Sequence, residues 1–227
     1  MNNGEYCRAI EAYLCRKNDG HLIRIVGPSF EKVCGWAEQG VPIKVAFRGI
    51  DRHFERYYAK GPRRRPVRID FCEADVLDVF DEWRRAVGVG ASASDGHARD
   101  RHETLPSHLE RVVARLSALR PETDRAFDAL IEAIVSELDA ARETAKGIRG
   151  SARAAVLERL AALDAQLMTF ARNRLTSDSR AELRREAEAE LAPFRARMPQ
   201  DAYDQSLAAC MDRLLREQAR LPILTLE

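Results

Sequence analysis

Apolar residues recur at alternating spacings of four and three through most of the second half of this chain. Separate runs of this kind begin at Leu105, Phe127, Val156 and Tyr203. The spacing places apolar side chains along one face of an α-helix, and its repetition across short turns is typical of helices that pack antiparallel. We therefore predict an antiparallel helical bundle over residues 105–227.

Two segments of this bundle should depart from regular helix. Pro193 follows a strongly charged stretch at 180–192, and a proline lacks the backbone N–H that a helix interior needs, so the helix should kink or end there. The tail at 222–226 is apolar, but its first residue is also a proline. We expect this tail to fold back onto the bundle or to contact a partner.

Residues 1–87 have a different composition and predict a small, aromatic-rich helical domain. They hold eleven of the fifteen aromatic residues, both tryptophans included. Glycine, proline and asparagine divide this part into short helices, and Ser29 is expected to cap the second one. The apolar segment at 21–26 predicts a short stretch of extended backbone. The expected helices cover about residues 5–17, 29–39, 42–60 and 72–87.

The core of this small domain should form where the apolar stripes of its helices meet. In the third helix the stripe again has spacings of four and three, which is one helical face. Its members are Ile43, Phe47, Ile50, Phe54 and Tyr57. The side chains expected to converge in the core are Trp36, Phe47, Ile50, Phe54 and Trp83.

The segment at 88–104 opens with a run of small, polar and glycine residues, which predicts a flexible linker between the two parts. The whole chain is thus predicted to be all-α, with more than about 60% helix and nothing larger than a short hairpin as sheet.

The overall charge, the apolar segments and the cysteines narrow the class of protein. Lysine and arginine (37) nearly balance aspartate and glutamate (36), so the net charge argues neither for nor against nucleic acid. No stretch approaches the roughly 18 apolar residues that span a bilayer, and the first residues lack a secretion signal, so we expect a cytoplasmic protein without membrane contact. The five cysteines include no CxxC pair and are expected to be reduced, buried hydrophobes.

The sequence contains no recognisable catalytic constellation. It has no phosphate-binding loop, dinucleotide-binding fingerprint, zinc-protease motif or serine-hydrolase motif. His97, His102 and His108 cluster around the linker, but their spacing does not place three imidazoles on one helical face, so we interpret them as solvated. We expect no catalytic residue, no metal site and no cofactor, and therefore a protein that is not an enzyme.

Basic residues recur along one face of the third helix and continue into the loop after it. Only two acidic residues, Asp51 and Glu55, oppose them between positions 44 and 68. Like charges spaced four apart on a helix repel one another, so an anionic partner such as a phosphate backbone would explain the arrangement. We call the following nine residues the basic ridge: Lys44, Arg48, Arg52, Arg56, Lys60, Arg63, Arg64, Arg65 and Arg68.

Carboxylates would balance the charge of the basic ridge equally well. The next helix carries enough of them to neutralise the ridge within the fold or between subunits, and an acidic protein partner would do the same. These carboxylates belong to Asp70, Glu73, Asp75, Asp78, Asp81 and Glu82. Exposed and unpaired arginines would favour nucleic acid, whereas arginines engaged by the acidic helix would favour a structural role.

The pattern over residues 22–85 resembles the DnaD-type domain of bacterial replication-initiation proteins. The resemblance is carried by the run from Ser29 to Trp36, by Gly40-Val41-Pro42-Ile43 followed by Val45–Ile50, and by a last helix that ends at Trp83. It implies a small helical fold, DNA binding and a role in loading the replicative helicase.

Two functional hypotheses follow. In the first, this is a DNA-associated accessory protein, in replication initiation or helicase loading, that holds the nucleic-acid backbone through the basic ridge. In the second, it is a non-catalytic helical adaptor or self-assembling scaffold. In both, the helical bundle docks a protein partner or associates with itself.

Overall fold

The structure is a computed structural model that describes residues 2–59, 61, 66–89, 104–119, 124–145 and 147–226. Helices make up 79% of it, as nine α-helices and two short 3₁₀ segments, and these ranges contain no strand. The prediction of an all-α protein is therefore confirmed. The predicted flexible linker at 88–104 lies mostly outside the described residues.

The chain divides into two compact units, which are described separately. Unit 1 comprises Met1–Gly96 together with Glu188–Ala209, and unit 2 comprises His97–Ala187 together with Cys210–Glu227. The segment at 188–209 thus belongs with the N-terminal unit, whereas the sequence placed it in the bundle. The spacing of apolar residues shows that a helix buries one face, but it does not identify the element that covers this face.

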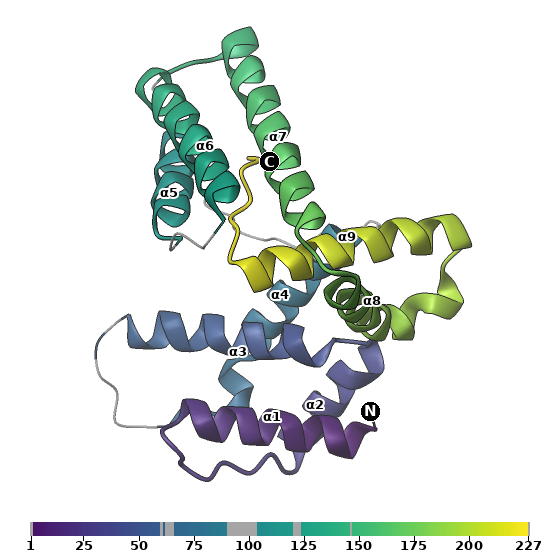
Figure 1. The fold of residues 1–227 in the computed structure, drawn as a ribbon. Coiled ribbons are helices and arrows are strands. Elements are labelled where there is room, and N and C mark those ends of the chain that lie inside the picture. The colour runs from purple at the N-terminus through teal and green to yellow at the C-terminus, as the bar shows by residue number, and fades with distance from the viewer. Residues whose placement is uncertain are drawn as a thin grey trace. The chain divides into compact units, whose positions relative to one another are not determined.

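The N-terminal part of unit 1 is built from four α-helices and a 3₁₀ turn, with α1 and α3 side by side (Figure 1). Asn2 caps α1 through a reciprocal pair of hydrogen bonds with Glu5, 2.8 and 3.0 Å long. Left-handed Gly40 ends α2. The elements are α1 (Asn3–Lys17), α2 (Pro28–Gln39), α3 (Ile43–Tyr58), η1 (Ile69–Phe71) and α4 (Glu73–Ala86).

One local prediction in unit 1 needs correction. Ser29 does not cap α2, because the helix begins one residue earlier at Pro28; its hydroxyl instead donates a 2.7 Å hydrogen bond to Asp70 Oδ1. The segment at 21–26 forms no strand, although Ile25 is buried and its N–H donates to Glu11 at 2.7 Å.

The predicted core of unit 1 is correct in four of its five members. Trp36, Ile50, Phe54 and Trp83 are buried, whereas Phe47 is only half-buried. The buried stripe of α3 is rotated from the predicted one and consists of Val45, Ala46, Gly49, Ile50 and Phe54. The rotation arises because small residues of α3 face the closely packed α4, which leaves Phe47 at the edge. There its ring stacks on Tyr13 of α1, with centroids 4.0 Å apart.

We therefore expect Phe47 and Phe54 to differ in their importance for stability. Phe54→Ala should cost about 3–5 kcal/mol, as for other buried aromatic residues, and Phe47→Ala clearly less, because its side chain is only half-buried. Urea unfolding followed by circular dichroism measures both free energies. Equal losses would show that the α1–α3 contact is as tightly packed as the α3–α4 contact.

Within unit 2, most residues of the predicted apolar stripes are buried, whereas others, such as Ile131 and Phe170, are half-buried. The stripes belong to three long helices, α5 (Leu105–Ser117), α6 (Arg125–Thr144) and α7 (Gly150–Asn173), and α6 and α7 run in opposite directions (Figure 1). The buried stripe residues are Leu105, Leu109, Val112, Leu116, Phe127, Ile134, Leu138, Leu160, Leu163 and Leu167.

The boundaries between the two units fall within the last two α-helices, α8 (Ser177–Leu191) and α9 (Gln200–Ala219). The proline prediction is confirmed, because α8 ends at Leu191 and a 3₁₀ segment, η2 (Ala192–Arg197), contains Pro193. In unit 1, Phe194 packs on Trp83 with centroids 5.6 Å apart, and the Trp83 indole N–H donates to Glu190 at 3.0 Å.

After α9, the tail folds back within unit 2, which is one of the two predicted outcomes. Leu221, Pro222 and Leu224 are buried there. In the part of the chain that the structure describes, no helix combines the length and the apolar character needed to cross a bilayer.

Candidate nucleic-acid interface

The described part of the basic ridge lies on α3 and on the segment that leads to η1. Lys44, Arg48 and Arg56 are exposed, and Arg52 is half-buried between α3 and α4. The fifth described member, Arg68, is exposed just before η1. The other four members of the ridge, Lys60, Arg63, Arg64 and Arg65, lie outside the described residues.

Carboxylates of unit 1 engage three of these five cations. Arg52 binds Glu82 at 2.6 Å, and this hydrogen bond raises the pKa of the guanidinium. The Arg68 guanidinium lies 3.3 Å from Asp70. Lys44 and Arg48 are not free either. Because the arginines are engaged, this pairing favours a structural role for the ridge.

The third pair is anchored on a buried carboxylate. Asp75, in the first turn of α4, has a side chain that is only 1% exposed, and its Oδ2 lies 2.6 Å from Arg56 and 3.0 Å from His53 Nδ1. Its Oδ1 has no hydrogen-bond partner among the described residues. A buried carboxylate is costly unless it is paired, so Arg56 and His53 have a structural task here.

His53 was missed by the sequence analysis. It follows Arg52 directly and no motif surrounds it, so nothing in the sequence indicates that it contacts a carboxylate. Its role depends on the register between α3 and α4, which brings it to Asp75 across 22 positions of sequence.

Even so, the ridge remains accessible to an anion. The side chains of Arg56 and Arg68 are 64% and 69% exposed despite their pairing. Water and salt reach both guanidinium groups and screen the exposed Arg68–Asp70 pair, so a phosphate could compete for the same guanidinium groups.

The described residues offer no metal site and no activated thiol. No group of three or more His, Cys, Asp or Glu among them could hold a metal ion. Burial raises the pKa of Cys72 to about 12 and that of Cys7 to about 11, which disfavours the reactive thiolate at neutral pH. All five cysteines are free.

The interpretation of the linker histidines also changes. His108 is not solvated: it is 3% exposed in the first half of α5, and its Nε2 lies 2.9 Å from the carbonyl oxygen of Leu224. The first two turns of a helix can face a core, and residues 221–224 cover this one. His97 and His102 lie outside the described residues.

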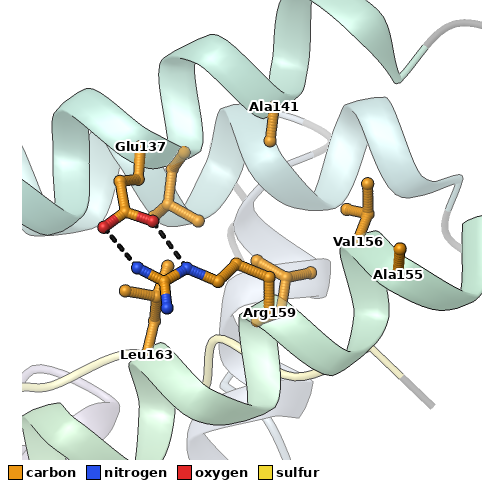
Figure 2. A pocket seen from close by; sticks show the side chains of 8 residues that line it. Glu137, Ala141, Ala155, Val156, Arg159 and Leu163 are labelled. Carbon is orange, nitrogen blue, oxygen red and sulfur yellow. Dashed lines mark hydrogen bonds and ion pairs between the residues drawn. The ribbon is translucent and has the colours of Figure 1, made fainter. Parts of the chain in front are cut away.

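A hollow of about 200 Å³ lies between α6 and α7 (Figure 2). Its lining is mostly apolar, and Arg159 donates two hydrogen bonds of 2.7 Å to Glu137 at its edge, which lowers the pKa of that carboxyl. The lining contains no nucleophile and no histidine, so the hollow provides no set of groups for acid–base or nucleophilic catalysis. Its remaining residues are Leu138, Ala141, Ala155, Val156, Leu160 and Leu163.

Comparisons of the chain with protein-family models, with curated proteins and with solved structures found no match. The resemblance of residues 22–85 to DnaD-type domains therefore stays a prediction that rests on the residues themselves.

Proposed function

We propose that this protein is a non-catalytic helical adaptor that acts through contacts with other proteins. The observation that supports this most is the pairing of the basic ridge with carboxylates of its own unit. Arg52 and Arg56 together bind two side chains of α4, so these charges already serve to hold α3 against α4. Five free thiols fit a reducing, cytoplasmic location, which is part of the proposal.

Exposed apolar side chains in unit 1 also support an adaptor. Leu22 and Val26, in the segment between α1 and α2, are 82% and 66% exposed. The hydrogen bond between Ser29 and Asp70 brings this region close to η1, where Phe71 is 63% exposed. Large apolar side chains exposed on a surface are typical of protein-binding sites.

A second candidate function is the DNA-associated accessory role, in replication initiation or helicase loading. The exposure of the Arg56 and Arg68 side chains favours it, because both could reach a phosphate. In this role the contacts would be largely independent of sequence, and the affinity would fall steeply with salt.

A titration with single- and double-stranded DNA at low and at high salt separates the two candidates. For an adaptor, we expect no saturable binding even at low salt. The triple variant Arg48→Glu, Arg52→Glu and Arg56→Glu should lose about 2 kcal/mol of stability, because new carboxylates would face Glu82 and buried Asp75. The DNA-binding role instead predicts salt-sensitive binding that the triple variant abolishes while its helix content stays intact.

A control variant with the same change in charge is available in unit 2. Arg125, Arg149 and Arg153 are exposed, and the structure shows no ion pair for them among the described residues. Changing these three to glutamate should leave the stability nearly unchanged. Wild-type protein that binds DNA tightly at low salt, and loses it only in the ridge variant, would contradict the adaptor proposal.

A further inference from the structure

The tail from Leu221 to Leu226 occupies a slot in unit 2 that has the features of a peptide-binding site. The tail forms neither helix nor strand. Leu224 is completely buried, whereas its neighbour Ile223 is 57% exposed. Leu221 and Pro222 are also buried, so apolar side chains of the tail are inserted on both sides of a residue that faces solvent, which is how an extended peptide anchors in a groove.

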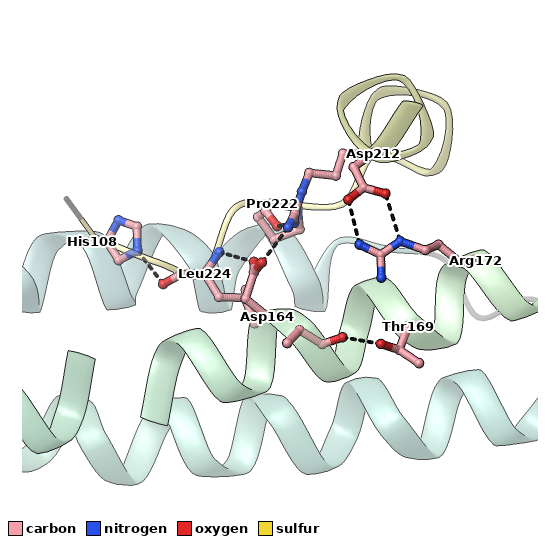
Figure 3. Close-up of polar contacts among 9 residues, drawn as sticks. His108, Asp164, Thr169, Arg172, Asp212, Pro222 and Leu224 are labelled. Carbon is pink, nitrogen blue, oxygen red and sulfur yellow. Dashed lines mark hydrogen bonds and ion pairs between the residues drawn. The ribbon is translucent and has the colours of Figure 1, made fainter. Parts of the chain in front are cut away.

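Side chains from two helices bind both backbone groups of Leu224 (Figure 3). Its N–H donates a 3.0 Å hydrogen bond to Asp164 Oδ1 on α7, and its carbonyl oxygen lies 2.9 Å from His108 Nε2 on α5. A carbonyl can only accept, so His108 Nε2 carries the hydrogen. Arg111 donates to the other ring nitrogen at 3.0 Å. The main chain provides the hydrogen bonds and Leu224 provides the apolar anchor, as in known modes of peptide recognition.

A third side chain ties the slot to the end of α9. Arg216 donates to the carbonyl oxygen of Pro222 at 3.0 Å and also binds the second oxygen of Asp164 (Figure 3). The side chains of Asp164 and Arg216 are only 14% and 17% exposed. If the tail left, sheltered polar groups would lose hydrogen bonds and the site of Leu224 would be empty, so the slot favours an occupant.

The connection between α9 and the tail is strained. Arg220 has φ +54°, in the left-handed region, where residues other than glycine are disfavoured. The N–H of Leu221 donates to the carbonyl of Arg216 at 2.9 Å, and that of Arg220 to Glu217 at 3.3 Å, which is a helix ending that normally has glycine at this position. A different hinge conformation would release this strain.

We propose that the slot binds the tail of a second copy of this chain, so that two copies exchange their tails at Arg220. Every contact that holds the tail within one chain can form between two chains, so exchange requires no additional complementary surface. Strained, short hinges favour such exchange. The proposed exchange gives unit 2 a partner, which is a second copy of the chain. It rests on the proposed function in one respect only, namely that the protein acts through contacts with other proteins.

Two full-length variants test the exchange by complementation. Asp164→Arg damages the slot, and Leu224→Asp damages the tail, so each variant alone should be monomeric in analytical ultracentrifugation. In an equal mixture, an intact tail meets an intact slot, and the altered pair has opposite charges. We expect a heterodimer only in the mixture. Two helical variants that stay monomeric when mixed would overturn the proposal.

A second pair of variants covers the case in which one of these fails to fold, as judged by circular dichroism. Proline cannot adopt a left-handed φ, so Arg220→Pro should open the hinge and shift the protein to dimer. Glycine removes the strain of the closed form, so Arg220→Gly should weaken dimerisation at least about fivefold relative to wild type. A monomeric Arg220→Pro protein would contradict tail exchange.

This experiment and the DNA titration report on different units. If the protein binds DNA and also exchanges tails, only the adaptor proposal is contradicted. If it binds no DNA and the mixed variants stay monomeric, only the tail exchange is contradicted.

Discussion

Replacing Gly49 with alanine should leave unit 1 barely stable or unfolded. An added Cβ would lie 2.4 Å from Val76 Cα and 2.8 Å from the Val76 backbone nitrogen. These are backbone atoms of the neighbouring helix, so no side-chain rotation can relieve the contact, and α3 and α4 must separate. Overpacking of a core typically costs about 1–3 kcal/mol, and we expect about 3 kcal/mol or more here because the backbone itself must move.

Gly35 provides the matched control, because it also lies in a helix interior. A Cβ there would meet only the side-chain nitrogen of Gln39, at 4.0 Å. Gly35→Ala should therefore stabilise the protein, by about 0.5–1 kcal/mol, since alanine restricts the unfolded chain and favours helix. Urea unfolding measures both variants. Similar free energies of unfolding for the two alanine variants would mean that α3 and α4 can separate at little cost.

The apolar pattern of the sequence was sufficient to predict the helices. Most residues of the stripes that contain Leu109, Ile134 and Leu163 are buried, because each periodicity arises within a single helix. The rotation of the α3 stripe could not be predicted in the same way. It depends on Gly49 and Ala46, whose small size permits close contact with α4. The predicted stripe was drawn through large apolar residues only, so these small residues were not part of it.

The candidate site shows a similar division. The basic ridge was evident from the sequence, as were the carboxylates able to neutralise it. Which cation meets which carboxylate depends on the register between α3 and α4, so the pairing of Arg56 and His53 with Asp75 had no signal in the spacing. The same holds for Leu224 and His108, which lie 116 positions apart and meet only because the tail returns to α5.

Trp83→Ala should unfold unit 1 almost as effectively as the change at Gly49. The indole is 2% exposed and packs against Phe80 and Phe194, with ring centroids 5.8 and 5.6 Å away. Truncating a buried aromatic residue costs about 3–5 kcal/mol, and the loss of the donor to buried Glu190 adds about 1–3 kcal/mol. Chemical denaturation followed by circular dichroism should therefore show a transition at much lower urea, or none.

Trp83→Phe separates the two contributions, since it keeps an aromatic ring and removes only the indole N–H and some volume. We expect a loss of about 1–3 kcal/mol, and adding Glu190→Gln should recover part of it, because a neutral amide is easier to bury than a carboxylate that has lost its donor. If the phenylalanine variant were as stable as wild type, the hydrogen bond to Glu190 would contribute nothing. Ring packing against Phe80 and Phe194 would then account for the contribution of Trp83 to stability.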